Sequence, residues 1–109
     1  MPNVYTNAKK DLTSTSVTTL YTTPALTTSI IKSILVSEDS GNADTITVTI
    51  TDAESSPAVF SLFKTKSISA NGTTELITAP LVAKTGEILK VTAATANRLH
   101  VVASILEVS

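Results

Sequence analysis

His100 is the single histidine of this 109-residue sequence, and histidine is the side chain that acid–base catalysis uses most often. Nucleophilic catalysis also needs a nucleophile beside the base. Serine and threonine are abundant, but none stands in the G-x-S-x-G pattern of a nucleophile elbow, and cysteine is absent. Because His100 lies within an alternating apolar segment, we interpret it as a sheet-surface or packing residue. The sequence therefore predicts no catalytic residue and a protein that is not an enzyme.

Acidic residues offer the next candidate chemistry, since carboxylate oxygens are the ligands that Ca²⁺ prefers. Glu38, Asp39 and Asp44 gather in one polar segment and are the metal-ligand candidates of this chain. Their spacing does not match the D-x-[DN]-x-[DN]-G pattern of a calcium loop. Such a segment is more typical of a solvated turn, so we predict no metal and no cofactor.

Composition argues against several classes of partner. The formal net charge is −1, which provides no basic field to attract nucleic acid or an anionic membrane. Base stacking and sugar stacking both need exposed aromatic side chains, and the chain has two Tyr, two Phe and no Trp. Three glycines form no phosphate-binding loop, and the first residues do not resemble a secretory signal. We therefore expect no nucleic acid, membrane or small-molecule substrate as partner.

The elements that position these residues are predicted to be strands. Thr, Val and Ile make up more than a third of the chain, and such β-branched residues favour a pleated sheet. About eight strands, spaced near ten residues apart, indicate one all-β domain with a β-sandwich fold, jelly-roll-like or immunoglobulin-like. We prefer the jelly roll because it has eight strands in two sheets. We expect residues 1–12 to form an arm or a weak first strand and residues 13–109 to form the sandwich.

Two local patterns are specific enough to predict details. In residues 45–51 Ile46, Val48 and Ile50 alternate with threonines, which predicts one buried face and one face toward water. Asn71-Gly72 predicts a type I′ hairpin turn, because both residues tolerate a positive φ. Loops are expected at residues 38–44 and 53–57, and another connection is expected around Leu81 and Val82.

Two further segments, residues 28–37 and 98–108, are apolar on both faces. A sandwich buries one face of each sheet, so the second face needs another cover. We expect Ile31 and Leu35, or Val102 and Leu106, to lie on such an outer face. The prediction is a homo-oligomer, with a trimer favoured, that is held partly through these residues.

Five stretches, taken in order, cover nearly the whole chain and carry a family resemblance. They are residues 17–28 (VTTLYTTPALTT), 31–37 (IKSILVS), 45–49 (TITVT), 86–93 (GEILKVTA) and 98–104 (RLHVVAS). Together they resemble a family of small all-β virion structural proteins of tailed bacteriophages. The resemblance implies a non-enzymatic sandwich that is present in many copies on the particle and has no catalytic residue.

The resemblance leaves the position on the particle open. We expect a capsid decoration (cement) protein on the outside of the head, in contact with the major capsid protein and with copies of itself. The first alternative is a tail, collar or fibre component of the same virion. The second is a glycan-binding or receptor-binding module that uses the polar loops. Under the virion hypotheses the protein is located in the particle, which is assembled in the host cytoplasm.

Overall fold

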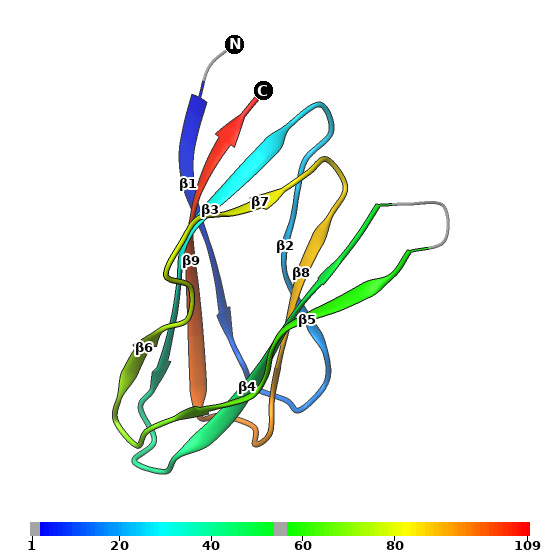
Figure 1. The fold of residues 1–109 in the computed structure, drawn as a ribbon. Coiled ribbons are helices and arrows are strands. Elements are labelled where there is room, and N and C mark those ends of the chain that lie inside the picture. Colours follow the sequence, from blue (N-terminus) through cyan, green and yellow to red (C-terminus); the bar gives the residue numbers. More distant parts are fainter. Residues whose placement is uncertain (1–2, 54–56) are drawn as a thin grey trace.

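A computed structural model of the chain describes residues 3–53 and 57–109. Its described residues form nine strands and no helix (Figure 1). The strands are β1 (Asn3–Asp11), β2 (Thr18–Thr22), β3 (Thr28–Glu38), β4 (Asp44–Thr51), β5 (Val59–Ile68), β6 (Thr73–Glu75), β7 (Leu81–Ala83), β8 (Ile88–Ala93) and β9 (Leu99–Val108). They pack as two antiparallel sheets, so the predicted all-β sandwich is confirmed. Most of the loop predicted at residues 53–57 lies outside the described residues.

The order of the strands identifies the type of sandwich. Sheet A has the order β1-β9-β3-β6, with β7 also paired to β3, and sheet B has the order β2-β8-β4-β5. Strands β6 and β7 pair with two successive parts of the same edge of β3, so they are one strand that is interrupted. Counted in this way, eight strands follow the orders 1-8-3-6 and 2-7-4-5. This is the arrangement of a jelly roll.

The core lies between the sheets and is made by alternating residues of the long strands. On β4 Ile46 and Val48 are buried while the threonines between them are half-buried, as the period of two predicts. On β9 the inward residues are Leu99, Val101, Ala103 and Ile105. These faces agree with the sequence pattern except at the end of β4, where Ile50, predicted to be buried, is half-buried and Thr51, predicted to face water, is buried. Val102 and Leu106 of β9 consequently lie on the outer side of sheet A.

The N-terminal segment is an edge strand and not an arm. Strand β1 pairs with β9 over its whole length, from Asn3 opposite Val108 to Asp11 opposite His100. Leu12, which follows it, is buried in the core. An edge strand with most side chains exposed needs little apolar alternation, which explains the weak pattern in the sequence. Of the two alternatives expected for this segment, the structure has the strand, over Asn3–Asp11.

The predicted hairpin at Asn71-Gly72 is wrong, because the strands on its two sides belong to different sheets. Strand β5 lies in sheet B and β6 lies in sheet A. Gly72 donates its N–H to the carbonyl of Ser69 at 3.0 Å, and Asn71 takes a φ of 56°. The residues therefore form a tight turn, as their types indicate, but the turn carries the chain from one sheet to the other.

Candidate functional site

The outer face of sheet A is the surface on which three of the four predicted interface residues lie. Leu35 is 40% exposed, and Val102 and Leu106 are half-buried there. Ile31, the fourth, is 0% exposed and belongs to the core. The pairing of β3 with β9 shifts between Ile31 and Ser33, so Lys32 is an extra residue in a bulge. The bulge reverses the alternation, which corrects the predicted outward position of Ile31.

One row across this face is apolar on four adjacent strands. The register brings together one residue each from β1, β9, β3 and β7: Tyr5, Leu106, Ile30 and Val82. Tyr5 is 75% exposed and Val82 is 54% exposed. The Lys32 ammonium nitrogen lies 6.0 Å from the centroid of the Tyr5 ring, at the outer limit of a cation–π contact. We name these four residues the apolar row.

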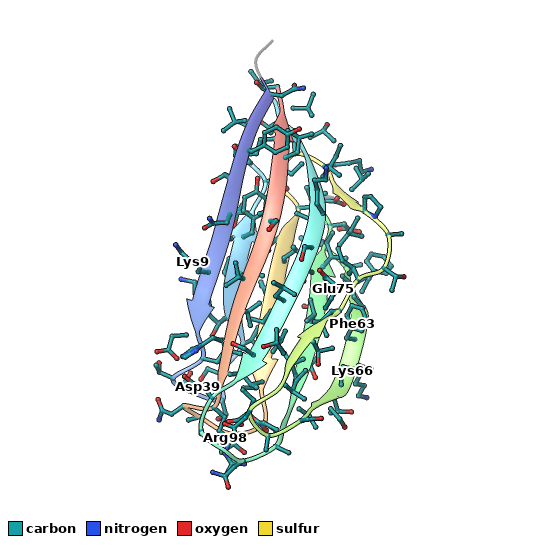
Figure 2. All side chains as sticks on the ribbon, turned by 90° about the vertical axis from the view of Figure 1, so that its left-hand side faces the viewer. Lys9, Asp39, Phe63, Lys66, Glu75 and Arg98 are labelled. Atoms are coloured by element: carbon teal, nitrogen blue, oxygen red, sulfur yellow. The ribbon has the colours of Figure 1, made fainter. Side chains whose placement is uncertain are left out.

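A second row has opposite charges at its ends. The register brings together Lys9, Val102, Leu35 and Glu75 from β1, β9, β3 and β6. Figure 2 looks onto this face, with Lys9 on the β1 side and Glu75 on the opposite side. Two apolar side chains lie between the charges. We name these four residues the charged row.

Glu75 fills the interruption between β6 and β7. Its carboxylate accepts the N–H of Ile34 at 2.8 Å, the N–H of Ile77 at 3.3 Å and the hydroxyl of Ser33. Burial by itself raises the pKa of Glu75, but the hydrogen bonds from Ser33 and the two amides outweigh burial and lower it. The carboxylate is thus held in place as an anion where β3 lacks a paired strand.

His100 lies at one end of the outer face, between two carboxylates. Its Nε2 is 3.2 Å from Oδ1 of Asp11, and its Nδ1 is 3.5 Å from Oδ2 of Asp39. All three side chains are partly exposed. These contacts tie β9 to β1 and to the β3–β4 loop. His100 therefore has the sheet-surface position that the sequence indicated.

The three metal-ligand candidates have separate partners. Glu38 accepts the N–H groups of Ser40 at 2.7 Å, Gly41 at 3.1 Å and Asn71 at 2.9 Å. Asp44 accepts the N–H of Thr95 at 3.1 Å, and Asp39 faces the histidine. Across residues 3–53 and 57–109, no three His, Cys, Asp or Glu side chains form a group that could hold a metal ion.

Glu38 is a buried residue rather than part of a solvated turn. Burial alone raises its pKa, but the hydroxyl of Ser40 and the amides of Asn71, Ser40 and Gly41 together lower it to about 2. The carboxylate thereby fixes the β3–β4 loop, which joins the two sheets, to the turn before β6. Its role is structural.

A polar cluster inside the sandwich was not predicted from the sequence. The Tyr21 hydroxyl on β2 donates to Glu107 on β9 at 2.5 Å and lies 2.6 Å from the hydroxyl of Ser29 on β3. Burial, followed by the bond to Glu107, raises the pKa of Tyr21 to about 12. The cluster joins sheet B to sheet A. The residues are far apart in sequence, and no spacing signals their contact.

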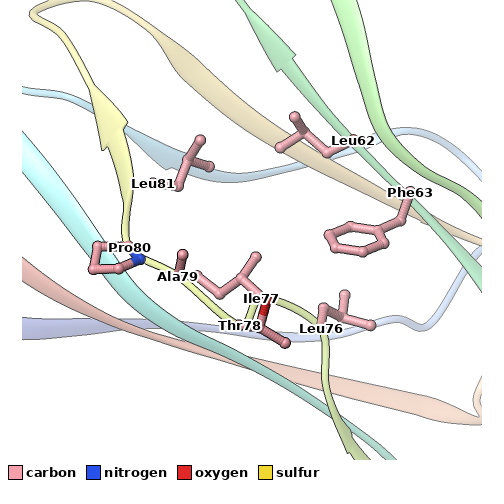
Figure 3. A pocket seen from close by; sticks show the side chains of 8 residues that line it. All are labelled: Leu62, Phe63, Leu76, Ile77, Thr78, Ala79, Pro80 and Leu81. Atoms are coloured by element: carbon pink, nitrogen blue, oxygen red, sulfur yellow. The ribbon is translucent and has the colours of Figure 1, made fainter.

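An apolar hollow of about 350 Å³ opens beside β5 (Figure 3). Leu62 and Phe63 lie on one side, and the segment between β6 and β7 lies on the other. Its described lining is Leu62, Phe63, Leu76, Ile77, Thr78, Ala79, Pro80 and Leu81. With one hydroxyl among these side chains, the hollow offers apolar contact and no acid–base chemistry.

The outer face of sheet B has a different character. Thr47 pairs with Thr92, and Thr49 pairs with Lys90 on one side and Ser61 on the other. Hydroxyl groups and an ammonium group therefore cover the middle of this face. Its side chains can hydrogen-bond to water without a partner protein.

No protein-family model matches the chain, and no curated protein matches its sequence. In the described part of the chain, no helix is long and apolar enough to cross a membrane.

Proposed function

We propose that this protein is a structural component of a tailed-phage virion, and specifically a decoration protein bound to the outside of the capsid. The observation that carries the proposal is the apolar row on the outer face of sheet A. Side chains such as Tyr5 and Val82 stand exposed on paired strands there. A contiguous exposed apolar patch of this kind is typical of a protein that works in an assembly.

Two further points support the proposal. The resemblance to small virion proteins runs in order through nearly the whole chain, and jelly rolls are a common fold of viral capsid proteins. Lectin domains use the same fold, so fold alone does not separate a virion protein from a glycan-binding module. The resemblance favours the virion. The partners would then be the major capsid protein and further copies of this chain.

The rigidity of the surface suits such a role. The backbone that carries these side chains is already ordered in paired strands, so binding costs little backbone entropy. Strand β9, at the middle of sheet A, is paired along both edges, to β1 and to β3. Binding therefore requires little reordering of the strands that present the apolar row.

The test is the position and copy number of the protein in purified particles. We expect hundreds of copies per particle by quantitative mass spectrometry against the major capsid protein, and density on the head surface by electron cryomicroscopy. Density confined to the tail, or a few dozen copies or fewer, would overturn the decoration role in favour of a tail component. Absence of the chain from purified particles would overturn the virion role altogether.

A further inference from the structure

We propose that the outer face of sheet A packs face to face against the same face of a second copy, about a two-fold axis that runs parallel to the strands between β9 and β3. The proposal does not depend on the virion role, because it concerns the purified chain in solution.

The rotation changes which strands of the two copies lie over one another. A two-fold axis along the strands reverses the order across the face and keeps the level of each row. Strand β9 of one copy then lies over β3 of its partner, and β1 lies over β6 and β7. Every row therefore meets its own reversed copy, and the contact is isologous.

The apolar row fits itself under this operation. Leu106 meets Ile30 of the second copy, and Tyr5 meets Val82, with each contact formed twice. The rotation covers two strongly exposed side chains, Tyr5 and Val82, with apolar partners. Removing apolar surface from water in this way favours association.

The charged row selects this axis over the other possible one. Rotation along the strands places Lys9 over Glu75 of the second copy and Val102 over Leu35. A two-fold axis across the strands, through the level of Ser104, would place Lys9 over Tyr5 and Glu75 over Val82. Only the first axis gives both Lys9 and Glu75 an opposite charge. Three hydrogen bonds already fix the Glu75 carboxylate, so this contact needs little further ordering of the side chain.

The geometry also determines copy number and approximate strength. An isologous face is closed by two copies, so the expectation of a trimer gives way to a dimer. Between the levels of Val108 and His100 the face extends about 27 Å along the strands, and four strands span about 14 Å across it. That is roughly 400 Å² on each copy, below the size of standard specific interfaces, so we expect a weak dimer.

The first experiment is sedimentation velocity of the purified chain from about 5 to about 500 μM. We expect a monomer–dimer equilibrium that Lys9→Glu weakens at least tenfold, because the introduced carboxylate would oppose that of Glu75. The matched control is Lys10→Glu, which makes the same charge change one residue away. Lys10 pairs with Val101, whose side chain faces the core, so Lys10 lies on the other side of β1. We expect this control to change the Kd less than twofold, with melting curves like the wild type for both variants.

A second experiment tests the axis itself. The chain has no cysteine, so cysteines introduced by Tyr5→Cys and Val82→Cys are the sole thiols. A bismaleimide that spans the ~10 Å between packed sheets should link residue 5 of one copy to residue 82 of the other, giving a covalent dimer on a denaturing gel. Neither single-cysteine variant should give that dimer.

The outcomes decide the proposal in either direction. A wild-type monomer at about 500 μM, equal weakening by Lys9→Glu and Lys10→Glu, or a double-cysteine variant without covalent dimer would each overturn it. A dimer that responds to Lys9→Glu alone and is trapped only in the double-cysteine variant would establish it.

Discussion

The two outer faces of the sandwich cover similar strands with different side chains. In the middle of sheet B the cross-strand neighbours carry hydroxyls, as where Thr47 lies opposite Thr92. In the apolar row of sheet A they are apolar, as where Leu106 lies between Tyr5 and Ile30. Threonine has the β-branched shape that favours a strand but leaves a hydroxyl for water. Strand formation therefore does not require the apolar outer residues of sheet A, and we propose that contact with a protein surface is the reason for them.

The largest effect on stability is expected from a charge on the inner face of sheet B, compared with the same charge on its outer face. Val48→Asp places a charge where the side chain is fully buried, between the two sheets. The free energy needed to bury an unpaired carboxylate exceeds the free energy of unfolding of a typical small domain. We expect no cooperative unfolding transition for this variant by circular dichroism.

Its matched control is Thr47→Asp, one residue away on the outer face. The Thr47 hydroxyl accepts the N–H of Thr65 at 3.1 Å, and a carboxylate can accept the same bond. The free energy of unfolding should change by less than about 1 kcal/mol. Indistinguishable urea-unfolding curves for the Val48 and Thr47 variants would show that the assignment of the two faces is wrong.

The next largest effect concerns the edge of sheet A. Deletion of residues 1–11 removes β1, which pairs with β9 over nine residue pairs. We expect the melting temperature to fall by more than about 10 °C, since a loss of about 2 kcal/mol is enough for such a shift. Tyr5→Thr, which keeps the strand but removes the ring of the apolar row, should melt within about 3 °C of the wild type. A deletion variant as stable as the wild type would mean that the segment behaves as an arm.

A smaller effect is expected where the chain passes from sheet A to sheet B. The pKa of Glu38 is about 2 in the folded protein against an ordinary value of 4.5. A lowered pKa means that the ionised carboxylate stabilises the fold above about pH 4.5, and that this contribution is lost as the pH falls toward 2. Urea unfolding of Glu38→Gln should therefore show a weaker decline of stability over this window than the wild type.

Ser40→Ala provides the control for that experiment, because it keeps the carboxylate and removes one donor to it. Its decline should begin at the same pH, which the unfolded chain sets, but it should be smaller and end at a higher pH, since the remaining donors lower the pKa less. Equal acid profiles for the wild type and Glu38→Gln would contradict the role of Glu38 in the β3–β4 loop.

The smallest effect on stability is expected for a lysine placed on either outer face. Leu106→Lys on sheet A and Thr92→Lys on sheet B each place a lysine on a half-buried outer position. We expect both to change the free energy of unfolding by less than about 1 kcal/mol. Light scattering should show reduced association for Leu106→Lys alone. Equal association of the two variants would remove the functional distinction between the faces.

The parts of the fold that could be predicted are those with an uninterrupted period of two. Strand β9, and strand β4 as far as Thr49, alternate without a break, so the burial of Val48 and Val101 follows from the pattern. Strand β3 is also rich in apolar residues, but the bulge at Lys32 exchanges its faces after Ile31. A bulge depends on pairing with another strand, and a single-strand pattern does not contain that information.

Long-range partners explain the other differences. Asn71-Gly72 forms a turn, as predicted, but the sheet that each neighbouring strand joins is decided by distant residues. Strand β7, predicted as a connection, is ordered by β3, some fifty residues earlier in the chain. For the candidate site, Leu35, Val102 and Leu106 were predictable as outer residues. Their alignment with Lys9 and Glu75 required the register.

The carboxylate of Glu75 has a consequence for aggregation. An unpaired stretch of strand edge is a template on which another chain can add a strand and begin a fibre. Between β6 and β7 the N–H of Ile34 would be such a template, but it is already bonded to Glu75. An approaching strand would meet an occupied donor and a negative charge. Together with the N–H of Leu76, which donates to the Ile34 carbonyl at 2.9 Å, this side chain protects a gap in the sheet that a longer β6 would otherwise have to close.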